Sequence, residues 1–128
     1  MNTSISLMDV KQFDVVLVRL DPVLGSEQRG TRPCVILQTN ALADAGRTII
    51  IAPCTSQKLN RIYPQEILMN PSKQNGLTQP SKIKIDQVRV IDTQRIAKKI
   101  GTLEKEYHVP ILRAIDIIFD REQLFQET

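Results

Sequence analysis

The chain has 128 residues, of which 41% are apolar and 24% are charged, and its formal net charge is +3. This is the length of one domain, and it can bury a core without disulfides or a structural metal. One histidine and two cysteines without a CxxC spacing are too few for a zinc site. The mild positive charge permits a polyanionic partner, but an ordinary basic surface explains it equally well.

No apolar run reaches the length of a membrane helix, and residues 1–12 lack the basic and apolar regions of a signal peptide. We interpret Cys34 and Cys54 as small buried residues in a reducing cytosol, with a disulfide as the alternative. The sequence therefore predicts a cytoplasmic protein with one domain over residues 1–128, of which residues 1–11 form a loosely ordered N-terminal extension.

The first half of the chain is patterned as strands with polar connections. Residues 13–20 (FDVVLVRL) are rich in β-branched residues and apolar on both faces, which is typical of a buried strand. Asp21-Pro22 ends this strand. Residues 34–38 and 48–53 predict the next two strands, and residues 39–47 between them form a loop with room for one helical turn.

The second half begins with a strand after Pro64, within residues 61–69, and a turn cluster at residues 70–76. Residues 82–91 (KIKIDQVRVI) alternate as a strand does, but the phase of the apolar positions slips. This slip predicts a β-bulge or bend near Asp86 and Gln87.

Residues 92–95 predict a capped single turn, and residues 96–101 predict a last short strand. From about Val109 the pattern becomes helical, and Pro110 suits the first turn of a helix. The apolar stripe of this helix is broader than a one-sided surface helix needs: Ile111, Leu112, Ala114, Ile115, Ile117, Ile118 and Phe119. The stripe either covers the sheet and meets a second subunit, or lies wholly within one core. The elements together predict a mainly β protein, a small bent antiparallel barrel with a C-terminal helix.

Two polar groups stand at the ends of predicted strands. Arg32 precedes Pro33, which restricts its backbone to extended conformations, so its guanidinium can be presented to a phosphate. Thr55 and Ser56 follow a buried strand, where hydroxyls either bind a phosphate oxygen or complete a turn. Taken alone, each group is explained better by a surface ion pair or by a turn.

A third group consists of Lys82, Lys84 and Asp86, which follow Ser81 at a spacing of two residues. This spacing predicts one strand face on which a cation lies beside a carboxylate. A nearby cation keeps a carboxylate ionised, as a general base requires. The alternative is a solvated strand face with a weak ion pair.

Residues 25–38 (GSEQRGTRPCVILQ) resemble the signature of the MazF/PemK/Kid toxins, which are mRNA endoribonucleases of type II toxin–antitoxin modules. The resemblance continues through DVVLVRLDP, IIIAPCTSQ and IDQVRVIDTQRI and covers roughly residues 13–120. It implies an SH3-like barrel of the type shared with the gyrase poison CcdB. It also implies a homodimer, single-stranded RNA as substrate, and a cognate antitoxin that blocks the RNA groove. No metal or other cofactor is implied.

Carried over position by position, the resemblance assigns catalysis to Arg32, Thr55, Asp86 and Lys84. Asp86 matches the base that takes the proton of the RNA 2′-OH, and Arg32 and Thr55 match groups that hold the phosphate. Lys84 stands where one branch has an arginine as acid, and we expect it to donate a proton more readily than an arginine does. The other matched residues are implied to bind RNA: Ser26, Glu27, Gln28, Ser56, Gln87 and Arg89.

Three positions depart from the family pattern. Phe13 replaces the usual glycine, Lys84 replaces the arginine, and Ser26 stands in the first loop where a histidine is found in the Kid-like branch. Two other functions therefore stay open: a CcdB-like gyrase poison on the same fold, and a catalytically inactive module that binds RNA or an antitoxin. The single histidine, His108, excludes a mechanism with two imidazoles in one chain. An aromatic content of 4% favours recognition of a few bases by polar loops over a stacking platform.

Overall fold

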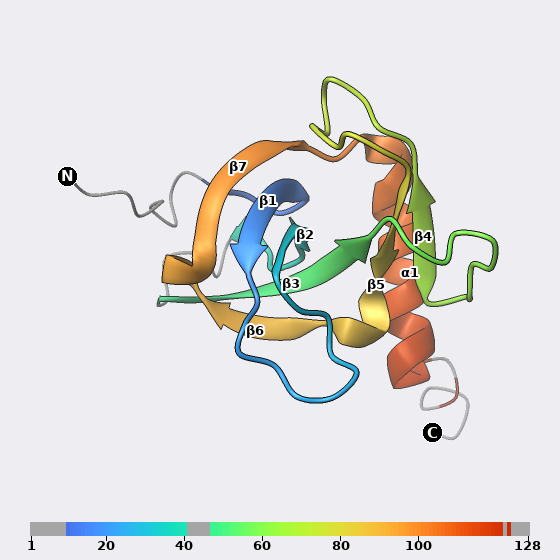
Figure 1. Ribbon diagram of the computed structural model, residues 1–128. Coiled ribbons are helices and arrows are strands. Elements are labelled where there is room, and N and C mark those ends of the chain that lie inside the picture. Colours follow the sequence, from blue (N-terminus) through green and yellow to red (C-terminus); the bar gives the residue numbers. More distant parts are fainter. Residues whose placement is uncertain (1–9, 41–46, 122, 124–128) are drawn as a thin grey trace.

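The computed structural model describes residues 10–40, 47–121 and 123 of the chain. Over these residues the strands curl into one bent antiparallel sheet, and α1 (His108–Phe119) lies beside β4 and β5 (Figure 1). The strands are β1 (Asp14–Arg19), β2 (Thr31–Ile36), β3 (Thr48–Thr55), β4 (Glu66–Met69), β5 (Ser81–Lys84), β6 (Arg89–Asp92) and β7 (Ile96–Thr102). The predicted class, mainly β with a C-terminal helix, is confirmed.

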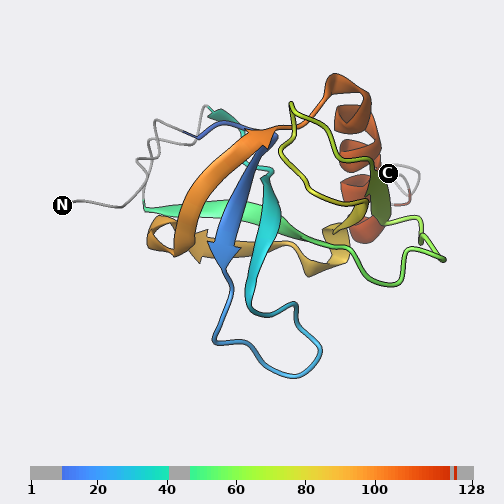
Figure 2. The ribbon, with the colours of Figure 1, turned by 45° about the horizontal axis from the view of Figure 1, so that its top comes forward.

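β3 is the central strand of the sheet, whose order is β4-β5-β3-β2-β1-β7 with β6 also paired to β3. The first half of β3 pairs with β6, and its last residues pair with β5. Its other edge pairs with β2, where Cys34 lies opposite Pro53. At the far side β7 curves strongly along β1, with two shifts of register between them (Figure 2). These changes of partner and register give the sheet its bend.

Residues 82–91 do not form one strand. β5 ends at Lys84, a 3₁₀ turn η3 covers Ile85–Gln87, and β6 begins at Arg89. The bend lies where the phase of the apolar positions slips, as the sequence predicts. However, the expectation that Asp86 shares a strand face with Lys82 and Lys84 is wrong, because the chain leaves the pleat after Lys84.

The interior consists of two clusters of apolar side chains on either side of β1. Val15 belongs to the cluster that α1 covers, and Val16 and Val18 belong to the other. The prediction that this strand is buried on both faces is confirmed. Val10 is buried in the second cluster, although residues 1–9 of the predicted extension lie outside the described residues. The turn expected within residues 39–47 is outside them as well, apart from its ends.

The capped turn and the helix form where the sequence predicts them. Asp92 Oδ1 accepts a hydrogen bond from Gln94 N at 2.8 Å, which caps the 3₁₀ turn η4 (Thr93–Arg95). In α1 Ile111 and Ala114 are buried, so the helix covers the sheet. Ile115 and Ile118 are partly buried against the cluster that α1 covers. The remaining large apolar side chains of the stripe are open in the single chain, since Leu112, Ile117 and Phe119 are 47%, 54% and 65% exposed. No helix of the described residues is long and apolar enough to cross a membrane.

Phe13 occupies a position that favours glycine, because its φ is 70°. Its ring stacks on the imidazole of His108, with the ring centroids 3.8 Å apart. His108 Nε2 also lies 3.2 Å from the carbonyl oxygen of Leu103. Both residues therefore join the start of β1 to the start of α1, which gives them a structural role.

Candidate active site

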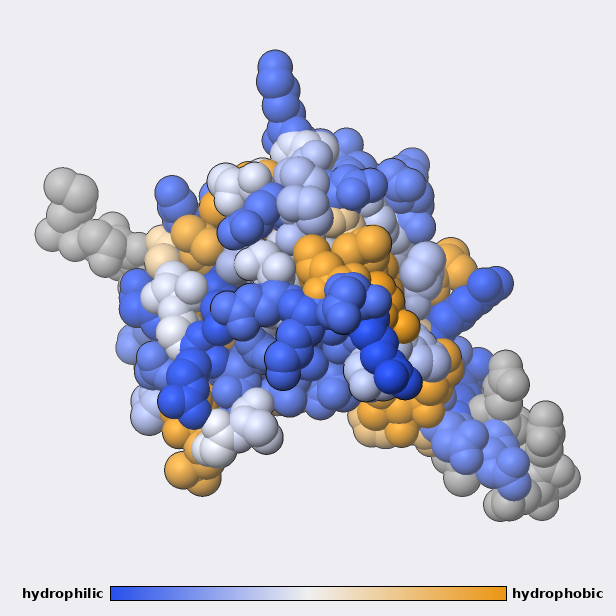
Figure 3. Space-filling model, turned by 45° about the vertical axis from the view of Figure 1, so that its right-hand side comes forward, coloured by the Kyte–Doolittle hydropathy of each residue, from blue (hydrophilic) through white to orange (hydrophobic). Residues whose placement is uncertain are grey.

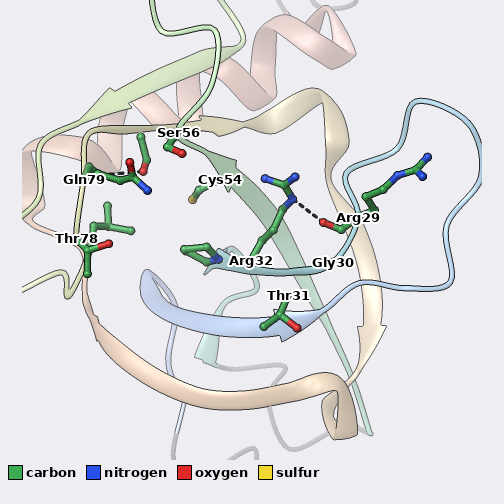
Figure 4. Close-up of a pocket in the computed structure, with 11 residues that line it drawn as sticks. Arg29, Gly30, Thr31, Arg32, Cys54, Ser56, Thr78 and Gln79 are labelled. Atoms are coloured by element: carbon green, nitrogen blue, oxygen red, sulfur yellow. Dashed lines mark hydrogen bonds between the residues drawn. The ribbon is translucent and has the colours of Figure 1, made fainter.

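A pocket of about 370 Å³ opens around Arg32 where β2 begins and β3 ends (Figure 4). β2 contributes Arg32 and Pro33, the end of β3 contributes Cys54 and the following Ser56, and the segment before β5 forms the facing wall. The residues that line it are Arg29, Gly30, Thr31, Arg32, Pro33, Cys54, Ser56, Leu77, Thr78, Gln79 and Ser81.

The guanidinium of Arg32 is held by a hydrogen bond at Nε. Its Nε donates a hydrogen bond to the carbonyl oxygen of Arg29 at 2.6 Å, within the connection between β1 and β2. The guanidinium then points into the pocket, toward the side that carries Ser56, whereas the side chain of Arg29 points away (Figure 4). An arginine held in this way can present its terminal nitrogens to a phosphate with little loss of rotamer freedom.

The hydroxyls of Thr55 and Ser56 have different surroundings. Thr55 is 8% exposed, and its Oγ1 accepts a hydrogen bond from Gln57 N at 3.2 Å, so it completes the turn after β3. Ser56 is exposed and lines the Arg32 pocket. Of the two roles open to this pair, the turn is observed for Thr55 and the pocket position for Ser56.

Asp86 lines a second pocket, of about 260 Å³, with Leu20, Glu27, Gln28, Pro53, Gln87, Val88 and Arg89. The backbone amide of Gln28 donates to Gln87 Oε1 at 3.4 Å, which joins the first loop to η3. Arg89 Nη1 donates to the carbonyl oxygen of Leu20 at 3.4 Å. Gln28 lines the second pocket, and the next residue, Arg29, lines the first. Arg32 of the first pocket and Arg89 of the second both act electrostatically on the Cys34 thiol, so the two pockets lie side by side.

The carboxylate beside the two lysines of β5 is Glu66 and not Asp86. Lys82 Nζ lies 3.0 Å from Glu66 Oε1, and Lys84 Nζ lies 3.3 Å from Glu66 Oε2. The reason is the pairing of β4 with β5, which sets Glu66 opposite Lys84. Burial alone raises the pKa of Glu66, but hydrogen bonds from Tyr63 N, Lys82 and Lys84 outweigh it and hold this pKa below its ordinary value.

The structure thus places most of the predicted site residues in two pockets and the others outside both. Arg32 and Ser56 line the first pocket, while Glu27, Gln28, Asp86, Gln87 and Arg89 line the second. Ser26 is exposed in the loop between β1 and β2, and Lys84 is paired with Glu66.

Several pocket residues had no clear signal in the sequence. The first pocket also holds Thr78 and Gln79, which lie between the predicted turn cluster and the next strand. Outside both pockets, Glu66 opens a short strand and also had no clear signal. Arg29 could have been predicted as a site residue, because it lies in the same polar stretch of residues 25–34 as Arg32.

The two cysteines are free and buried, as the sequence predicts. Burial raises the pKa of Cys34 to about 12, against a smaller opposing effect of Arg89 and Arg32, and burial likewise raises the pKa of Cys54. Neither thiol is therefore a nucleophile near neutral pH. Within the described part of the chain, no three His, Cys, Asp or Glu side chains form a group that could hold a metal ion.

Solved structures share this fold. MazF from Deinococcus radiodurans aligns with a TM-score of 0.72 at 19% identity, covering 87% of this chain and 96% of that one. The Mycobacterium tuberculosis toxin MazF-mt6 aligns with a TM-score of 0.69 at 24% identity, covering 84% and 96%. The class of protein is therefore the small β-barrel of the MazF type with a C-terminal helix, which confirms the predicted fold.

Sequence comparison then identifies the family. The family described as PemK-like, MazF-like toxin of type II toxin–antitoxin system matches residues 11–119. Endoribonuclease EndoA of Bacillus subtilis is 34% identical over 110 residues, which are 86% of this chain and 94% of that protein. Endoribonuclease MazF of Staphylococcus saprophyticus is 33% identical over 108 residues, 84% and 89% of the two chains. This chain belongs to the PemK-like, MazF-like toxins of type II toxin–antitoxin systems.

Proposed function

We infer that this toxin acts as its relatives EndoA and MazF do: it is a MazF-type toxin endoribonuclease. We propose that it cuts single-stranded mRNA at a short sequence, without a metal, and thereby inhibits translation and growth. The observation that carries this proposal is the pair of adjoining pockets, one with Arg32 and Ser56 and the other with Asp86. One short RNA segment laid across both would meet a guanidinium, a hydroxyl and a carboxylate.

In this mechanism the RNA supplies its own nucleophile. Asp86 takes the proton of the 2′-OH, whose oxygen forms a bond to the adjacent phosphorus while the bond from phosphorus to the 5′-oxygen breaks. Arg32, Thr55 and Ser56 hold the non-bridging oxygens as negative charge builds on them. The products are a 2′,3′-cyclic phosphate and a 5′-hydroxyl.

Lys84 remains our candidate for protonating the departing 5′-oxygen. Its ammonium lies 3.3 Å from Glu66 Oε2 and its side chain is 19% exposed. Donation to RNA therefore requires Lys84 to exchange Glu66 for the leaving group. Glu66 keeps its second ion pair, to Lys82, when Lys84 leaves.

The second pocket is suited to the nucleotides beside the cut. Gln28 and Gln87 carry amides that can hydrogen-bond to base edges, and Ser26 and Glu27 lie in the same loop. Arg89 can contact a neighbouring phosphate. We therefore propose that these five residues bind RNA and that the target is read by hydrogen bonds. Because the substrate is mRNA, we place the toxin in the cytoplasm.

We further propose a homodimer that a cognate antitoxin binds. A largely apolar groove of about 390 Å³ runs between α1, β6 and the first half of β3, and Ile50, Val90, Ile115 and Phe119 are among the residues that line it. Apolar side chains gather over part of the surface in Figure 3. A second copy would bury this groove. A solved mycobacterial endoribonuclease, with a TM-score of 0.70, is in complex with its cognate antitoxin, and an antitoxin that covers both pockets here would exclude RNA.

The test incubates the purified protein with a defined single-stranded RNA or its 2′-deoxy counterpart, each in the presence and in the absence of EDTA. We expect cutting of the RNA alone, with a cyclic phosphate at the new 3′ end. Cutting of the deoxy strand, or loss of cutting with EDTA, would contradict the 2′-OH mechanism or its independence of metal. No cutting together with inhibition of DNA gyrase would support the CcdB-like alternative, and RNA binding without either activity would support the inactive module.

A further inference from the structure

The loop of residues 56–65 between β3 and β4 has no buried apolar side chain. Its first residue, Ser56, lines the Arg32 pocket. Every residue from 56 to 65 is exposed or only half-buried. A surface loop without a buried apolar side chain is mobile unless polar contacts hold it.

Lys82 supplies those contacts from beneath the loop. Its side chain is 4% exposed, and its ammonium donates to the carbonyl oxygens of Lys58 at 3.0 Å and Arg61 at 3.2 Å. The third donor goes to Glu66 Oε1 at 3.0 Å. A lysine ammonium has three N–H groups, so these partners satisfy it fully. Glu66 Oε1 also accepts from Tyr63 N at 2.9 Å, which ties a further loop residue to the same ion pair.

Lys82 also lies next to the proposed catalytic hydroxyls along the sheet. In the pairing of β3 with β5 it is directly opposite Thr55, so the two side chains share a face. An apolar residue at position 82 would avoid the cost of burying an ammonium. It could not, however, bind two loop carbonyls. This argues that the lysine serves the geometry of the loop.

We propose that Lys82 is a positioning residue of the nuclease site: it holds the loop of residues 56–65 so that Ser56, the first residue of this loop, faces the phosphate that Arg32 is proposed to bind. It does this from below the loop and without touching RNA. The inference rests on the proposed endoribonuclease function, but its structural part, the tethering of the loop, can be tested without RNA.

The first experiment compares Lys82→Met with Lys99→Met. Lys99 is a matched control, because its Nζ lies 3.2 Å from Oδ2 of another buried carboxylate, Asp14. Asp14 begins β1, whereas Arg32 pairs with Val18 near the other end of that strand. We expect Lys82→Met to lower kcat for RNA by about 10- to 100-fold with KM little changed, because displaced catalytic groups cost rate. Lys99→Met should stay within about twofold of wild type.

Limited trypsin digestion tests the tether directly. Trypsin cuts after Lys58 and Arg61, and both of their carbonyl oxygens accept from Lys82. We expect these two bonds to be cut faster in Lys82→Met than in wild type or Lys99→Met. Equal cutting rates in all three proteins would overturn the proposal. Absence of RNA cutting by the wild type, together with faster trypsin cutting of the loop in Lys82→Met, would refute the proposed function and support the contact between Lys82 and the loop.

A double-mutant cycle separates positioning from a general loss of stability. If Lys82 acts through this loop, Lys82→Met should cost much less activity in a Ser56→Ala background than in wild type. Equal losses in both backgrounds would overturn the proposal. Should Lys82→Met fail to fold because Glu66 is left with one cation, Lys82→Met combined with Glu66→Gln removes both charges. Normal kcat and a protected loop in that protein would refute the tether.

Discussion

The two ends of β3 border different kinds of surface, one apolar and one polar. Near its start, Ile50 lines the apolar groove beside α1, and at its end Cys54 and the following Ser56 line the polar Arg32 pocket. Ile50 and Cys54 are therefore only about 13 Å apart along the strand, at a rise of about 3.3 Å per residue. The difference arises because β3 changes partner from β6 to β5 along its length.

The turn η3 belongs to both regions at once. Ile85 lines the floor of the apolar groove, whereas Asp86 and Gln87 line the second polar pocket. Val88 and Arg89, which follow the turn, line both. The proposed dimer groove and the proposed site therefore use neighbouring residues of one backbone segment. They can be tested separately only through residues that line one of the two, such as Val90 and Arg32.

The largest expected effect is on the polar region. Arg32→Ala should lower the rate of RNA cleavage by about 100- to 1000-fold, because it removes a preorganised cation from the developing charge. RNA binding should stay measurable, and the oligomeric state should not change. Single-turnover cleavage and a filter-binding assay measure the two properties. Arg47→Ala is the control, since Arg47 is exposed just before β3 at its opposite end. Equal cleavage by the two variants would remove Arg32 from the mechanism.

The second largest effect is expected in the apolar groove, where a charge should weaken the proposed dimer. Val90→Lys places a charge in the groove, where Val90 is 56% exposed in the single chain. We expect the dissociation constant of the proposed homodimer to rise at least about 100-fold, since burying an unpaired ammonium is costly. Light scattering coupled to gel filtration reports the mass. Leu24→Lys is the control, because Leu24 is 83% exposed in the first loop. A Val90→Lys dimer as tight as that of the control would show that the groove is not the interface.

A smaller effect concerns the dependence of stability on pH. The pKa of Glu66 in the folded protein lies below its ordinary value of 4.5, so its ion pairs stabilise the fold fully above that pH. This contribution is lost as the pH falls through the folded pKa, when the carboxylate takes up a proton. The Tm of wild type should therefore fall more between about pH 6 and about pH 3 than the Tm of Lys82→Met/Glu66→Gln. Parallel profiles would mean that Glu66 contributes nothing to acid sensitivity.

The smallest effect is expected at the two thiols in the centre of the sheet. Burial raises the pKa of both Cys34 and Cys54, so neither is a thiolate near neutral pH. We expect Ellman's reagent to label the native protein at less than about 1% of the rate of the unfolded chain. Labelling in the presence and absence of guanidinium chloride measures the ratio. Rapid labelling of the native protein would show that β2 and β3 separate easily.

The sequence by itself determined what depends on local patterns. Strand runs such as residues 13–20, the bend near Asp86 and the helix after Pro110 follow from the apolar period and from residues that favour turns. The polar stretch around Arg32 and the motifs after it also indicate the toxin family, because they are contiguous in the chain.

Tertiary structure decided how distant segments meet. Asp86 looked like the partner of Lys84 at a spacing of two residues, but the 3₁₀ turn and the pairing of β4 with β5 give that place to Glu66. The sequence left open whether the apolar stripe of the helix is buried or partly exposed. It also could not predict that the site is divided into two adjoining pockets. The physical reason is that strand pairing and burial join residues far apart in sequence, and no short window of residues records which partners will be chosen.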